Sequence, residues 1–407
     1  MNAIIKFFRK KKFASKNRVT NIDAKGKIPP SCELIYSNNY IGLSAEAARI
    51  CYNSAEKSSE SAKLKYIENK VKAGHESVIE HTNIVVEFTV DKNSTYIDHL
   101  IDFISAAKFL YVKHYTADQN DIIVLSGSIL GFKQLIRRSD AKNNIFITML
   151  IFQLYKLPKQ FFYDFIYDGI MQENLFKYFE NKESNTTISD INKQTSFVVD
   201  KNNNQYLDII SYSNYDNIIE RYPFDDAIDM ITISVVFSNM SRACCQQVNR
   251  HRNATSMQSQ RYVKENNFNF IYPDAIQNEK LDNILAEIQS NYNNLINQGY
   301  KPEDARSILP MNCASKQMIS FTLRNAIHFC KIRTEHGAQS EVRKFAEVLK
   351  QYILNTFGEK INEDNFNDFL LPRYDKDQKQ FELDNTAIDE VEEFEEIYPT
   401  GDMEGYE

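Results

Sequence analysis

The stretch from Arg250 to Tyr262 reads Arg-His-Arg-Asn-Ala-Thr-Ser-Met-Gln-Ser-Gln-Arg-Tyr and contains no acidic residue. An arginine side chain can donate two parallel hydrogen bonds to a phosphate or an acidic imide, and serine and glutamine add neutral hydrogen bonds. The stretch therefore indicates a site for an anion. If the Arg250-His251-Arg252 triplet stood alone, a solvated basic turn or a nucleic-acid patch would explain it equally well. The rest of the chain must therefore distinguish these interpretations.

Three other blocks of the chain carry similar chemistry. They are Gly74–His81 (Gly-His-Glu-Ser-Val-Ile-Glu-His), Arg306–Pro310 (Arg-Ser-Ile-Leu-Pro) and Arg324–Gln339. With the first stretch, and in this order, they resemble the signature blocks of the flavin-dependent thymidylate synthases, over about residues 45–90 and 228–355. The loop Asn253–Gln258 has six residues where that family usually has seven, so the equivalence of Thr255–Gln258 stays open.

The composition is that of a soluble globular protein, with 407 residues, 43% hydrophobic and 25% charged. The net charge of −7 disfavours bulk attraction to nucleic acid, so an anion site must be local. No apolar run is long enough to span a bilayer. The six cysteines include no Cys-x-x-Cys pair, and we expect reduced thiols in a cytoplasmic protein without a metal site. They are Cys32, Cys51, Cys244, Cys245, Cys313 and Cys330.

We expect three parts in the chain: a basic tail over 1–28, a family-like domain over 29–360 and an acidic tail over 361–407. The basic tail is either a solvated segment or a weak interfacial helix. The acidic tail has no lysine or arginine after Asp384, and we expect it to be disordered.

The expected fold is α/β, with a mixed central sheet flanked by helices. Hydrophobic patterns predict strands over 81–90 and 228–237, helices over 60–73 and 281–298, a helix from about Ser315, and a last helix through Val342 and Ile353. The stretch of about 92–227 does not fit the compact family pattern, and we expect a mainly helical insertion with a polar loop over 182–205. The insertion either covers one side of the core or forms a lid over the active site.

The resemblance implies two sets of ligand residues. The residues assigned to FAD are Ser77, Arg250, His251, Arg252, Gln258, Arg324 and His328. The residues assigned to dUMP are Gln247, Arg250, Ser259, Gln260, Arg261, Arg306 and Arg333. Arg324 and His328 are four residues apart and should share a helix face. Arg333 lies about 140° around the helix from His328 at roughly 100° per residue. Arg333 is the expected catalytic residue, because a guanidinium stays charged and stabilises a uracil anion.

The resemblance implies an FAD-dependent thymidylate synthase, a methyltransferase that converts dUMP to dTMP with 5,10-methylenetetrahydrofolate as carbon donor and NADPH as reductant. It implies a homotetramer, and we expect no nucleic-acid or membrane partner. A cysteine-dependent thymidylate synthase is excluded, since its nucleophile follows a proline and no cysteine here does. A metallohydrolase using His75, Glu80 and His81 would need an unusual ligand spacing. A non-catalytic nucleotide- or RNA-binding protein of the same fold remains the alternative.

Overall fold

The computed structural model describes residues 31–55, 59–92, 97–116, 120–138, 145–154, 157–162, 195–211, 216–251, 253–265, 268–276 and 278–369. The basic tail lies outside these residues, as does the acidic stretch from residue 370 onward. The folded part continues beyond the boundary expected at residue 360, because Ile361 and Phe366 are buried in the core. None of the described helices has the length and apolar character needed to cross a bilayer.

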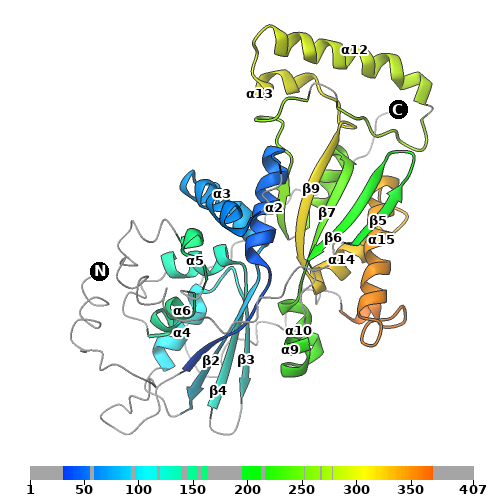
Figure 1. The fold of residues 1–407 in the computed structure, drawn as a ribbon. Helices are drawn as coiled ribbons and strands as arrows, with labels where there is room; N and C mark the ends of the chain where they lie inside the picture. Colours follow the sequence, from blue (N-terminus) through cyan, green and yellow to red (C-terminus); the bar gives the residue numbers. More distant parts are fainter. Residues whose placement is uncertain are drawn as a thin grey trace, which may run out of the picture. The chain divides into compact units, whose positions relative to one another are not determined.

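Two antiparallel sheets form the framework, as Figure 1 shows. The first has the order β1-β2-β4-β3, with β1 (Ser31–Ser37), β2 (Ile84–Asp91), β3 (Tyr111–Thr116) and β4 (Asn120–Gly127). The second has the order β5-β6-β7-β9-β8, with β5 (Thr195–Asp200), β6 (Gln205–Ser211), β7 (Thr232–Ser241), β8 (Ala254–Met257) and β9 (Ala314–Thr322). The α/β class is confirmed, but the single mixed sheet that we expected is two sheets whose described strand pairs are all antiparallel.

Helices connect and cover these strands. In the first half they are α2 (Tyr40–Tyr52), α3 (Glu60–Lys72), η1 (Glu76–His81), α4 (Ile97–Ala106), α5 (Ile129–Arg138), α6 (Ile145–Leu154) and η3 (Lys159–Phe162). In the second half they are α9 (Asp216–Arg221), α10 (Phe224–Met230), α11 (Arg242–Val248), α12 (Asn278–Asn297), α13 (Pro302–Ala305), η4 (Arg306–Ile308), α14 (Leu323–Arg333), α15 (Ser340–Thr356) and η5 (Phe366–Phe369). The side chains of Ser59, Ser241 and Thr322 accept from backbone N–H groups in the first turns of α3, α11 and α14, which fixes where these helices begin.

The insertion contains more strand than the sequence predicted. The stretch of about 92–227 contains helices α4, α5 and α6, in line with the mainly helical character that we expected, but it also contains strands β3 to β6. Strands β3 and β4 complete the first sheet, and β5 and β6 extend the second. β5 and the start of β6 fall within the stretch 182–205 that we expected to be a loop, of which 182–194 lie outside the described residues. The stretch of about 92–227 therefore supplies strands to both sheets.

Two boundaries in the second sheet also differ from the prediction. The segment from Ala314 to Thr322 is strand β9, and the helix expected from Ser315 begins only at Leu323. Successive β9 residues are buried from Gln317 to Phe321, so the strand shows no alternation and resembles a buried helix in sequence. The strand expected from Ile228 begins at Thr232, because residues 224–230 form α10.

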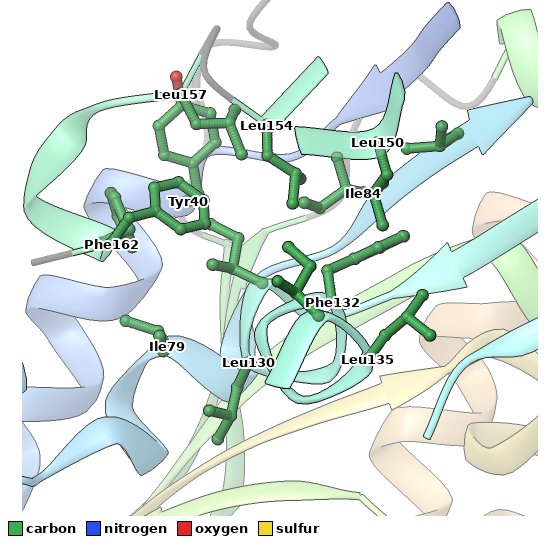
Figure 2. Close-up of a cluster of buried hydrophobic side chains, with 14 of the residues drawn as sticks. Tyr40, Ile79, Ile84, Leu130, Phe132, Leu135, Leu150, Leu154, Leu157 and Phe162 are labelled. Carbon is green, nitrogen blue, oxygen red and sulfur yellow. The ribbon is translucent and has the colours of Figure 1, made fainter. Parts of the chain in front are cut away.

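The insertion helices share a hydrophobic core with η1 and β2. Figure 2 shows Ile79 of η1 and Ile84 of β2 in the same cluster as α5 and α6. The labelled side chains of those two helices are Leu130, Phe132, Leu135, Leu150 and Leu154. A second cluster fills the space between the second sheet and helices α14 and α15. The turn before β2 is thus packed against the insertion.

A fully buried histidine joins η1 to the second sheet. His81 Nδ1 lies 2.9 Å from Ser320 Oγ on β9, and Nε2 lies 3.0 Å from Ser256 Oγ on β8. Burial lowers the pKa of His81 to about 3, so the ring is neutral. Both ring nitrogens are engaged by hydroxyls, which leaves neither for a metal ion and removes a ligand from the metallohydrolase reading.

His81 should make the protein less stable in acid. The folded pKa lies below the ordinary value of 6.5, so its contribution is complete above pH 6.5 and is lost as the pH falls toward 3. One proton contributes up to about 1.4 kcal/mol per pH unit, or about 2 kcal/mol between pH 6.5 and pH 5. In urea denaturation, His81→Gln should reduce the pH dependence of the free energy of unfolding by this amount. The same change at the exposed His336 serves as control, and equal slopes for wild type and His81→Gln would contradict the assignment.

Candidate functional site

Residues from two sequence blocks meet where α14 ends beside the segment after α11. Arg333 Nε donates to His251 Nε2 at 2.8 Å, and Arg333 Nη2 donates to the Gln247 carbonyl at 2.9 Å. The ring centroids of His251 and His328 are 6.2 Å apart. We call Arg333, His251, Gln247 and His328 the Arg333 cluster. The fold thus brings together residues that are as much as 86 positions apart in the chain.

The electrostatics of the Arg333 cluster favour an anion. Burial, followed by the charges of Arg333 and its neighbours, lowers the pKa of His251 to about 4. The neutral ring accepts from Arg333 through Nε2 and therefore carries its proton on Nδ1. Burial also lowers the pKa of His328. Arg250 is exposed beside the cluster, so the charges here are guanidinium groups and the imidazoles are neutral.

Arg324 has different partners from His328, although both lie on α14. Its Nε donates to Asp229 Oδ2 at 2.9 Å, and Nη2 donates to Asp225 Oδ1 at 3.0 Å. Nη1 donates to the carbonyl of Phe369 at 3.3 Å, and the side chain is only 7% exposed. The structure therefore places Arg324 in a buried contact among α10, α14 and η5.

A second group of side chains surrounds the turn before η1. The rings of His75 and Tyr262 lie 5.8 Å and 5.7 Å from the ring of Tyr52, and Lys70 Nζ lies 3.2 Å from the same ring centroid. We call these four residues the Tyr52 cluster. Ser77 is exposed two residues beyond His75. The sequence pattern did not predict that Tyr52 and Lys70 lie beside His75 and Tyr262, because an aromatic residue at a helix end and a lysine on α3 carry no signal of their own.

The end of the first signature stretch is folded against α2. Ser259 N donates to the Cys51 carbonyl at 3.0 Å, while Ser259 Oγ accepts from the backbone of Arg261 at 3.1 Å. Gln260 is buried, with its amide 3.8 Å from Cys313 Sγ. Gln258 N donates to the Lys316 carbonyl, which continues the β8–β9 pairing. Arg261 and Tyr262 are the exposed residues of this stretch.

Two arginines assigned to dUMP lie on neighbouring segments. Arg261 pairs with Glu303 of α13 at 3.3 Å, with both groups partly exposed. Arg306 begins η4, which follows α13, and its side chain is exposed. Arg252 lies outside the described residues. The exposed ion pair of Arg261 is weak and competes little with a phosphate.

Strand β8 separates the two clusters. Gln247 and His251 of the Arg333 cluster precede β8 in the chain and the Ser259–Tyr262 turn follows it, with β8 at the edge of the second sheet. Four extended residues span about 13 Å. Predicted ligand residues therefore flank the edge strand β8 in the sequence, whereas Arg324 is held by Asp225 and Asp229.

The chain matches one protein family over two segments. The family described as thymidylate synthase complementing protein matches residues 33–97 and 180–357. A flavin-dependent thymidylate synthase of Pyrococcus furiosus is 34% identical over 135 residues, which cover 31% of this chain and 55% of that protein. The one from Nitratidesulfovibrio vulgaris is 32% identical over 136 residues, covering 30% and 56%. The chain thus spans a little over half the length of these relatives.

Removal of Arg324 should chiefly destabilise the fold. Arg324→Met leaves the half-buried Asp229 carboxylate without its partner, a loss on the order of 3 kcal/mol. The double variant Arg324→Met/Asp229→Asn removes both charges and should recover part of the loss in urea denaturation. If Arg324→Met were as stable as wild type, the buried ion pair would not have the structural role described here.

Proposed function

Because the chain belongs to the family of thymidylate synthase complementing proteins, we propose that it is an FAD-dependent thymidylate synthase. In this proposal it converts dUMP to dTMP, with 5,10-methylenetetrahydrofolate as carbon donor and NADPH as reductant. The observation that carries the proposal is the Arg333 cluster, where a guanidinium is held by a neutral imidazole and a carbonyl. The matched relatives are named as flavin-dependent enzymes, which supports the choice of cofactor.

The donor set fits a flavin nucleotide. Ser77 offers an exposed hydroxyl, Arg250 an exposed guanidinium, and His251 and His328 neutral imidazoles. Asn253 Nδ2 is buried and has no hydrogen-bond partner among the described residues. We assign FAD to these groups together with Arg252 and Gln258, and Arg324 would join them only by giving up its carboxylates. When bound, FAD would supply the redox chemistry that completes the methyl group.

We assign the arginines to two different parts of dUMP, the phosphate and the uracil ring. Arg250, Arg261 and Arg306 are exposed cations suited to a monophosphate of charge near −2. Gln247, Ser259 and Gln260 would add hydrogen bonds to the nucleotide. Arg333 would face the uracil, where its permanent charge stabilises the anion formed when N3 loses a proton. His251 acts on Arg333, because its Nε2 lone pair fixes the direction of the guanidinium plane.

We further propose a cytoplasmic homotetramer with active sites at subunit junctions. Its support is the spread of ligand residues along the β8 edge, which a neighbouring subunit would complete. We expect no nucleic-acid or membrane partner. The alternative is a nucleotide- or RNA-binding protein that keeps the fold without turnover, and bound FAD distinguishes the two.

The purified protein should be yellow and bind FAD stoichiometrically. His328→Ala should release FAD more readily while dUMP binding changes less, since His328 is assigned to the flavin. Absorbance spectra and FAD titration of the wild type and of this variant measure both effects. Colourless protein that cannot be reconstituted with FAD would overturn the enzyme proposal.

Arg333→Ala should weaken dUMP binding about ten- to a hundredfold, the value of a charge-assisted hydrogen bond, and should also slow the chemical step. Arg333→Lys should restore this only in part, because an ammonium lacks the planar fork. His251→Ala should give a smaller loss of the same kind. The measurements are dUMP titration of the flavin spectrum and single-turnover dTMP formation, with Lys331→Ala on the same helix as control. Unchanged turnover in Arg333→Ala would mean that the dUMP site lies elsewhere.

A further inference from the structure

Helix α5 lies outside the residues that match the family, but it contacts the signature block Gly74–His81. The family match stops at residue 97 and resumes at residue 180, and α5 (Ile129–Arg138) lies between these limits. In the fold, α5 packs against η1, which carries the Ser77 turn. Charged, polar and apolar side chains all contribute to this contact.

The charged contact is centred on Glu76, the residue before Ser77. The Lys133 ammonium has no exposed surface and bonds Glu76 Oε1. Arg137 forms a two-point contact with the same carboxylate, at 2.9 Å from Nη1 to Oε2 and 3.1 Å from Nη2 to Oε1. A buried ammonium is stable only beside its counter-charge, so Lys133 ties the position of α5 to that of Glu76.

A second polar contact lies at the other end of η1. Thr82 Oγ1 accepts from Ile129 N at 2.7 Å, which caps the first turn of α5, and donates to the Ile79 carbonyl at 2.6 Å. Between the two polar contacts, Ile79 packs in the cluster that contains Leu130 and Phe132 (Figure 2). Helix α5 therefore holds η1 at its start, along its buried side and at its end.

The opposite side of η1 faces solvent. His75 and Ser77 are exposed, whereas Val78, Ile79 and His81 are buried. The short helix thus has one side fixed by the insertion, and its other side presents Ser77, which is assigned to the flavin. A ligand group displaced by ~1 Å loses as much as a hundredfold in effectiveness, so a fixed support has a direct functional consequence.

We propose that α5 of the insertion positions the Ser77 turn for cofactor binding, and that it acts through the contact of Lys133 and Arg137 with Glu76. The cofactor part rests on the proposed function, while the positioning part does not. Glu76, Lys133 and Arg137 are positioning residues in this account, since none of them is assigned to a ligand.

The test uses the full chain and two measurements. Lys133→Met removes the buried charge but keeps most of the side-chain volume, and Lys72→Met makes the same change in an exposed lysine–glutamate pair on α3. Hydrogen–deuterium exchange of the ligand-free protein follows residues 75–82, with α15 as internal reference. FAD titration then measures the dissociation constant. Arg137→Gln is a second, partly exposed variant in case Lys133→Met does not fold.

Lys133→Met and Arg137→Gln should speed exchange over 75–82 while α15 is unchanged, and should raise the FAD dissociation constant about tenfold. When Glu76→Gln is already present, Lys133→Met or Arg137→Gln should raise the exchange rate and the FAD dissociation constant by less than in the wild type, because the Glu76 carboxylate that both side chains contact is already lost. Unchanged exchange over 75–82 in a folded variant would overturn the inference, as would faster exchange that includes α15 equally. If wild type binds no FAD, the proposed function fails and the exchange result still decides the role of α5.

Discussion

The imidazole of His81 contacts the paired strands β8 and β9, with both ring nitrogens hydrogen-bonded to serine hydroxyls. Ser320 is also bonded to Ser234 on β7, so one neutral ring connects η1 with three strands of the second sheet. A neutral histidine offers one donor and one acceptor, and a serine hydroxyl can fill either role. This contact fixes the Ser77 turn relative to β8. His251 of the Arg333 cluster and Tyr262 of the Tyr52 cluster lie just before and just after that strand in the chain. The arrangement of the candidate site depends on His81 remaining uncharged.

The η1 turn is therefore held from two directions. His81 fixes its end to the second sheet, while Lys133 and Arg137 fix its start to the insertion. Burial acts on the two contacts in opposite ways. Burial lowers the pKa of His81 and so keeps the ring neutral. Burial would raise the pKa of Glu76, but the cationic groups of Arg137 and Lys133 outweigh it, so the pKa of Glu76 is lowered. A short 3-10 helix has few hydrogen bonds of its own, so these side-chain contacts supply the rigidity that it lacks.

Local patterns predicted the amphipathic elements and missed those whose partners are distant. Helices α3, α12 and α15 lie close to their expected positions, because each has one buried and one exposed side. The sequence predicted a helix where β9 lies, because this strand is buried on both faces. It predicted a loop where β5 lies, because an asparagine-rich turn follows that strand. In the site, Arg333 and His251 are 82 residues apart, and Arg324 and Asp229 are 95 apart. Only the tertiary fold decides such pairings.

The two arginines of α14 show how the fold separates structure from binding. Arg324 is buried against Asp225 and Asp229, so its charge is neutralised within the chain. Arg333 donates instead to an imidazole and a carbonyl, and burial together with Arg250 lowers its pKa. A guanidinium nevertheless stays charged, so the Arg333 cluster gathers positive charge that its hydrogen-bond partners do not neutralise. An anion that binds there relieves this repulsion and stabilises the folded state in proportion to its affinity. Helix α14 therefore carries one arginine whose charge is paired within the chain and one that, in the proposed function, binds the anionic substrate.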